Sequence, residues 1–187
     1  QRNTGEMGDG SLGPSLIVCP ASLVYNWGAE FTKFAPSFNA VVVAGTKAER
    51  RTAIGRAFRA DEPTVLITSY DLLRRDVDDY TANEQRFNVM ALDEAQYIKN
   101  HTTKIAKAVD AEAADVRFAL TGTPIENRLS ELWSIFDFLM PGLLGSYKRF
   151  HERYELPISN ARAADGSTAE GRAAAQVNPE AARVSRQ

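Results

Sequence analysis

The feature that most constrains the fold of this 187-residue chain is a series of five short apolar runs, each followed by polar residues. The runs occupy 15–19, 40–44, 64–68, 89–92 and 116–120. Their length and continuous hydrophobicity are typical of strands that are buried on both faces in a parallel sheet. Helical spacing of apolar residues follows in 21–35, 47–60, 102–113 and 130–140. This alternation predicts an α/β layer fold with a mostly parallel sheet.

Polar residues follow four of the five predicted strands directly. They are Pro20-Ala-Ser22, Thr68-Ser69-Tyr70, Asp93-Glu94 and Thr121-Gly-Thr-Pro124. In open parallel sheets the ligand site lies beyond the carboxyl ends of the strands, and right-handed crossovers bring these ends to the same edge. We therefore expect the four polar segments to share one edge of the sheet.

Asp93 and Glu94 are the strongest candidates for chemistry, because unpaired charges directly after a buried strand are costly. In nucleotide-hydrolysing proteins an Asp at this position holds the Mg²⁺ that bridges the β- and γ-phosphates. A neighbouring carboxylate can orient or deprotonate the attacking water. The alternative for an isolated pair is a solvated acidic turn, so the pair needs support from other segments.

Thr121-Gly-Thr-Pro124 supplies that support. Gly122 allows a tight turn, and the hydroxyls of Thr121 and Thr123 can bond a carboxylate or a phosphate-bound water. Taken alone, the same residues also fit a threonine-rich turn that ends the sheet. Its spacing after Asp93-Glu-Ala-Gln96 makes the combined pattern specific.

An ordered set of motifs resembles the first ATPase lobe of the SWI/SNF-type DNA translocases of helicase superfamily two. The segments that resemble motifs Ia, Ib, II and III are, in order, 16–27 with 30–31, 66–72, 92–100 and 119–133. Residues 136–139, 141–144, 150–154 and 157–158 resemble the segments that come after motif III in the same lobe. One such motif is a weak signal, whereas four in the right order are a strong one.

The resemblance implies a RecA-like three-layer αβα fold and roles for individual residues. It implies that Asp93 binds Mg²⁺, that Glu94 positions or deprotonates the hydrolytic water, and that Gln96 senses the γ-phosphate or contacts a second lobe. Thr121 and Thr123 would couple the nucleotide state to the DNA groove. A set of loop residues would line the path of double-stranded DNA: Pro20, Ser22, Thr68, Ser69 and Tyr70. Trp27 lies in an apolar helical stripe, for which a role in the core is the better interpretation.

The phosphate-binding loop of such enzymes has no counterpart here, because the sequence contains no G-x-x-x-x-G-K-[ST] and no Gly-Lys pair. We therefore expect residues 15–158 to form a partial first lobe that lacks the phosphate-loop strand. Residues 1–14 are expected to be a flexible lead-in, and 159–187 an Ala- and Arg-rich linker or the start of a helical insertion towards a second lobe. ATP and Mg²⁺ would be the cofactors of the intact enzyme, whereas this stretch alone is expected to be inactive.

Composition limits the alternatives only in part. The net charge is -2, so DNA binding would need a local basic face. The basic residues of 47–60, including Arg50 and Arg51, have a solvated helix face as their default interpretation. Cys19, the single cysteine, is expected to be a small buried residue in the absence of any disulfide partner. No signal peptide or membrane-spanning run is apparent, which predicts a cytoplasmic location.

Two rival interpretations of function stay open. One is another nucleic-acid ATPase of superfamily two, such as an RNA helicase or a restriction-type translocase. The other is a non-catalytic interaction module with a nucleotide-binding fold. The segments around Trp133 and Pro141 favour the double-stranded DNA translocase over the first rival.

Overall fold

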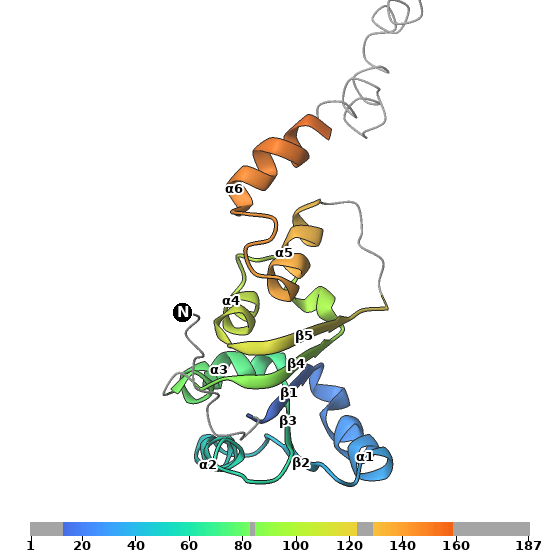
Figure 1. The fold of residues 1–187 in the computed structure, drawn as a ribbon, viewed down its shortest axis with the longest axis vertical. Helices are drawn as coiled ribbons and strands as arrows, with labels where there is room; N and C mark the ends of the chain where they lie inside the picture. Colours follow the sequence, from blue (N-terminus) through green and yellow to red (C-terminus); the bar gives the residue numbers. More distant parts are fainter. Residues whose placement is uncertain (1–12, 83–84, 123–128, 159–187) are drawn as a thin grey trace, which may run out of the picture.

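The computed structural model of the chain describes residues 13–82, 85–122 and 129–158. Five parallel strands form one sheet in the order β2-β3-β1-β4-β5, as Figure 1 shows. The strands are β1 Ser15–Cys19, β2 Asn39–Val42, β3 Thr64–Ser69, β4 Phe87–Asp93 and β5 Ala114–Leu120. The predicted α/β class is confirmed, and the sheet is parallel throughout.

Within the described residues, six α-helices accompany the sheet. They are α1 Val24–Phe34, α2 Lys47–Ala57, α3 Tyr70–Tyr80, α4 Lys104–Ala111, α5 Leu129–Leu139 and α6 Tyr147–Phe150. Short 3-10 helices, η1 Ala21–Leu23 and η3 Ala95–Ile98, precede α1 and follow β4, and a π-helical turn, η4 His151–Glu155, follows α6. A capping box starts α2, in which the Thr46 side chain accepts from the Glu49 N–H and Glu49 accepts from the Thr46 N–H.

Several helix boundaries differ from the sequence prediction, and α2 and α4 are shorter than the predicted 47–60 and 102–113. The helix predicted for 21–35 is split, because η1 forms the first turn and α1 begins only at Val24. In the C-terminal part, α5 begins at Leu129, one residue before the predicted start at 130. The largest addition is α3, because the sequence pattern predicted no helix after the polar residues that end at Tyr70.

The helices cover both faces of the sheet and enclose two apolar clusters. The larger cluster joins Leu16, Leu66 and Met90 of the strands with side chains from α2, α3, α4 and α5. On the other face, Ile17 and Ile67 pack against α1. Figure 1 shows α1 on one side of the sheet and α2 and α3 on the other. This three-layer arrangement leaves the ends of the strands as the place for a ligand site.

Strand β5 lies at one end of the sheet and leaves part of its surface open. Among the described strands it pairs only with β4. Val116, Phe118 and Leu120 are 44%, 53% and 46% exposed. They alternate along the strand, so they share one face. Phe118 is in register with Ala91, and Ala91 packs against the cluster under α1. The exposed side chains of β5 therefore lie on the same face of the sheet that α1 covers over other strands.

Glu112 is a buried acid in the connection between α4 and β5. Its side chain is among the largest that are fully buried, and Oε1 has no hydrogen-bond partner within the described residues. Arg117 donates to its backbone carbonyl at 2.7 Å. Burial raises the pKa of Glu112 to about 8, and the nearby Arg117 charge opposes that rise.

The raised pKa predicts that stability depends on pH. Between the ordinary pKa of 4.5 and about 8 the folded chain holds a proton on Glu112 that the unfolded chain has lost. The free energy of unfolding should therefore fall as pH rises from 5 to 8, by at most about 1.4 kcal/mol per pH unit. Glu112→Gln should remove this part of the slope. Urea unfolding at pH 6 and 8 measures it, with Asp115→Asn, at an exposed position, as the control. An unchanged slope in Glu112→Gln would contradict the assignment.

The described part of the chain contains no helix that is long and apolar enough to cross a membrane. Cys19 is buried, as expected, and its thiol faces the Thr68 carbonyl at 3.8 Å. Burial, reinforced by the Asp93 charge, raises the pKa of the Cys19 thiol to about 12. The thiol is therefore protonated at neutral pH and serves as a small packing group.

Candidate functional site

The acidic pair and the threonine turn meet at the carboxyl edge of the sheet. Asp93 is the last residue of β4, and Thr121 directly follows the last residue of β5. Asp93 is in register with Leu120, so the two chain segments leave the sheet side by side. The structure therefore brings together the two segments that the sequence singled out.

A chain of hydrogen bonds links Glu94 to Thr121 through Gln96. The Thr121 hydroxyl donates to Gln96 Oε1 at 2.8 Å, and Gln96 Nε2 donates to Glu94 Oε2 at 2.6 Å. Gln96 uses both ends of its amide in this chain, which fixes its orientation. A displacement of the turn after β5 would thus reach the Glu94 carboxylate through a single side chain.

The backbone at Glu94 is unusual. Its φ of 54° and ψ of 53° lie in the left-handed region, and it is the only such non-glycine residue in the described part of the chain. A side chain in this conformation costs about 1 kcal/mol or more, and such residues cluster at functional sites. It turns the chain abruptly from β4 into η3, so that Asp93 and Glu94 both stay at the edge of the sheet.

Two aromatic side chains hold Asp93. Trp27 Nε1 donates to Asp93 Oδ2 at 2.9 Å, and the Tyr70 hydroxyl donates to the Asp93 carbonyl at 2.8 Å. Tyr70 also stacks on Tyr97, with ring centroids 4.7 Å apart. Burial, with a contribution from the Asp93 charge, raises the pKa of Tyr70, so its hydroxyl remains a donor. Sequence reasoning missed both contacts, because apolar spacing explained Trp27 as part of the core.

The five predicted DNA-contacting residues have different environments. Ser22 is exposed in η1, and Pro20 is half-buried just before it. Thr68, Ser69 and Tyr70 are buried, at 0%, 4% and 3% exposure. Ser69 Oγ caps α3 by accepting from the Leu72 N–H, while Tyr70 bonds Asp93. Ser69 and Tyr70 therefore already bond groups inside the protein, and Thr68 is buried. Contact of any of the five residues with DNA stays a prediction.

The predicted site extends beyond the described residues at Thr123, which belongs to the gap at 123–128. Gly122 is described, and its φ is not positive. A Cβ built there would meet no atom within 4 Å among the described residues. The described residues therefore show no steric need for glycine at position 122, where the sequence had suggested one.

The carboxylates fit Mg²⁺ in the way that nucleotide enzymes hold it. Within the described ranges no group of three or more His, Cys, Asp or Glu side chains could enclose a metal ion. Mg²⁺ seldom uses such a cage; it is bound by one or two carboxylates and takes its remaining ligands from phosphates and water. Asp93 and the adjacent Glu94 provide that donor set at an accessible edge.

Comparisons with known proteins agree with this geometry. The SNF2-related domain family matches residues 2–177. The chain is 45% identical over 157 residues to the TATA-binding protein-associated factor MOT1 of Saccharomyces cerevisiae, covering 84% of this chain and 8% of that protein. It is 46% identical over 142 residues to an uncharacterized ATP-dependent helicase of Mycoplasma pneumoniae, covering 76% of this chain and 13% of that protein.

The fold matches a solved structure described as the Sulfolobus solfataricus SWI2/SNF2 ATPase core in complex with dsDNA. The TM-score is 0.67 at 41% identity, covering 81% of this chain and 30% of that one. The chain therefore spans less than a third of the ATPase core and less than a tenth of the yeast relative. The family match over residues 2–177, together with this RecA-like fold, shows that the chain belongs to the SNF2-related family of helicase superfamily two.

Proposed function

We propose that this chain is part of the first ATPase lobe of an ATP-dependent translocase on double-stranded DNA. The proposal rests on the carboxyl edge of the sheet, where hydrogen bonds through Gln96 link Glu94 to Thr121 beside Asp93. Residues 15–158 would be the part of the lobe that holds these groups, and a phosphate-binding loop and a second lobe would complete the enzyme.

The chain's own residues suggest how ATP hydrolysis would proceed. Asp93 would hold Mg²⁺, which would neutralise charge on the phosphates of bound ATP. Glu94 would orient the attacking water and accept its proton. Gln96 lies between Glu94 and Thr121 and would report the state of the nucleotide to the turn after β5. Thr123 would act with Thr121 in that turn.

Two observations support DNA as the partner. The Sulfolobus structure that matches this fold is named as a complex with dsDNA. In this chain, Ser22 lies exposed at the edge of the sheet next to the site, before α1. Helix N-termini and hydroxyls commonly bind the phosphate backbone, a mode of contact that does not depend on base sequence. Opening and closing of two lobes on ATP would then move the protein along the duplex.

The test is ATP hydrolysis by the full-length protein that contains this domain. We expect Mg²⁺-dependent phosphate release that double-stranded DNA stimulates more than single-stranded DNA or RNA does. Stronger stimulation by RNA would favour an RNA helicase of the same superfamily. Absence of hydrolysis with every nucleic acid, despite measurable DNA binding, would favour a non-catalytic module and contradict the proposal.

A further inference from the structure

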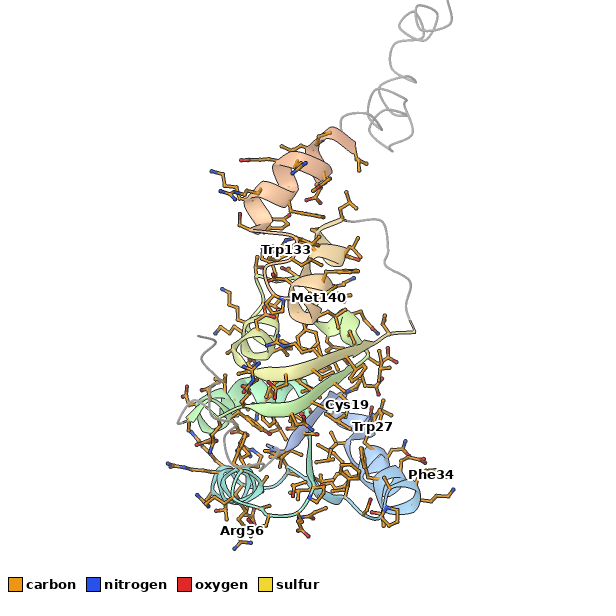
Figure 2. The ribbon with its side chains drawn as sticks, viewed as in Figure 1. Cys19, Trp27, Phe34, Arg56, Trp133 and Met140 are labelled. Atoms are coloured by element: carbon orange, nitrogen blue, oxygen red, sulfur yellow. The ribbon has the colours of Figure 1, made fainter. Side chains whose placement is uncertain are left out.

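The hydrogen bond between Trp27 and Asp93 connects residues that are 66 positions apart in the sequence. Trp27 is on α1 and Asp93 ends β4, so the bond joins a helix that covers the sheet to the acidic edge. Figure 2 shows Trp27 on the side of α1 that faces the strands, close to Cys19 at the end of β1. A buried indole N–H usually bonds some acceptor, and here that acceptor is the carboxylate at the end of β4.

The Trp27 ring is held firmly enough to orient its partner. It is half-buried and packs against the cluster of Ile17, Val24 and Ile67 under α1. Its centroid lies 6.3 Å from that of Phe31, one helical turn further along. An indole N–H is a donor only, so the group that it faces must be an acceptor. The packed ring therefore fixes the direction in which Asp93 Oδ2 can point.

The backbone of Asp93 is fixed independently. The buried Tyr70 hydroxyl donates to its carbonyl, and β5 pairs with its strand. With the backbone held by these contacts, the main freedom left to Asp93 is rotation of its side chain. The bond from Trp27 restricts this rotation, and it leaves the remaining lone pairs of the carboxylate available.

From these contacts we infer that Trp27 is a positioning residue for the Mg²⁺-binding carboxylate of Asp93. The inference rests on the proposed function, which makes Asp93 a metal ligand. Partners that orient metal ligands typically change metal affinity or activity by about 10- to 100-fold when they are removed. Because α1 directly follows Pro20 and the short helix η1 that contains Ser22, the same bond also connects Asp93 to the predicted DNA-contacting segment.

A first experiment tests the bond without any need for activity. The chain contains two tryptophans, Trp27 and Trp133, so its indole N–H groups give two signals in a ¹H–¹⁵N spectrum. Trp133 Nε1 donates to the neutral carbonyl of Gly145 at 3.2 Å and serves as the internal reference. Asp93→Asn and titration with Mg²⁺ alone should each shift the Trp27 signal and leave that of Trp133 in place. An unmoved Trp27 signal in Asp93→Asn would overturn the inference.

A second experiment measures the consequence in the full-length protein. Trp27→Phe keeps an aromatic ring for packing but removes the N–H donor. It should raise the Mg²⁺ concentration for half-maximal ATP hydrolysis by about 10-fold or more. Trp133→Phe loses an indole bond away from the site and should leave that concentration unchanged. An unchanged Mg²⁺ requirement in Trp27→Phe would show that Trp27 serves packing alone.

A third variant distinguishes loss of the N–H donor from loss of folding. Benzothienylalanine, incorporated at position 27 alone of the full-length protein by stop-codon suppression, replaces the indole N–H by sulfur and retains the two-ring shape. It should reproduce the raised Mg²⁺ requirement while keeping the unfolding midpoint near that of the parent. A normal Mg²⁺ requirement in this protein would overturn the inference. If the wild-type protein hydrolyses no ATP, the proposed function fails, whereas the indole signals still decide whether the bond exists.

Discussion

Replacing Glu94 by Gln is expected to lower the DNA-stimulated rate of ATP hydrolysis by about 10²- to 10⁴-fold, the range that a general base contributes. The amide retains the size of the side chain and can still bond Gln96, but it cannot accept a proton from water. Binding of ATP should change little, so the effect should fall on kcat more than on KM. Steady-state hydrolysis by the full-length protein, with saturating double-stranded DNA, measures both.

The stability of Glu94 variants should not follow their activity. Glu94→Gly should stabilise the folded chain by about 1 kcal/mol, because glycine tolerates the left-handed backbone at φ 54°. It should also destabilise the chain by about 1 kcal/mol, because the bond from Gln96 is lost. The free energy of unfolding should thus stay within about 1 kcal/mol of the parent while hydrolysis is lost. Glu62→Gln, at an exposed glutamate before β3 and away from the site, is the matched control. Substantial hydrolysis by Glu94→Gln would refute the assigned role.

The fold and much of the site were predictable because both depend on local patterns. Short continuous apolar runs favour buried strands, and parallel pairing then puts their carboxyl ends together. The run at 116–120 does form a strand, but one face of it is exposed instead of buried. Asp93 and Thr121 were predicted to share an edge on this ground, and the register of Asp93 with Leu120 bears that out. The amide of Gln96, which links them, depends on side-chain geometry that a pattern does not contain.

The sequence was less informative where one side chain has two functions or a helix is polar. Trp27 has the spacing of a core residue and packs, half-buried, against the cluster under α1, so nothing in its position indicated the bond to Asp93. Helix α3 was missed because its second half contains the aspartates Asp76, Asp78 and Asp79. Non-helical backbone angles at Asp76 interrupt it further. Tertiary contacts with α2 and α4 compensate for this poor helical propensity.

Asp76 shows why charge patterns mislead. Its carboxylate is 1% exposed and accepts from Arg50 Nε at 2.5 Å and Nη2 at 2.8 Å. Arg50 was expected on a solvated helix face, yet it is 8% exposed and also donates to the Gly45 carbonyl at 2.7 Å. The hydrogen bond to Asp76 is the main reason why the pKa of Arg50 is raised. Helices α2 and α3 are thus joined by a buried ion pair with two parallel bonds.

Asp76→Ala should therefore destabilise the chain by about 3–5 kcal/mol, because it leaves the Arg50 charge buried with only a carbonyl as partner. The same two helices supply the control. The exposed Arg51 pairs with the half-buried Asp79 at 3.3 Å, and Arg51→Ala should cost at most about 1 kcal/mol. Urea unfolding at constant pH compares them. The double variant Arg50→Met, Asp76→Leu removes both charges and should recover much of the loss, since the cost comes from an unpaired charge and not from loss of the pair itself. Equal effects of Asp76→Ala and Arg51→Ala would show that water reaches Arg50 in the folded protein.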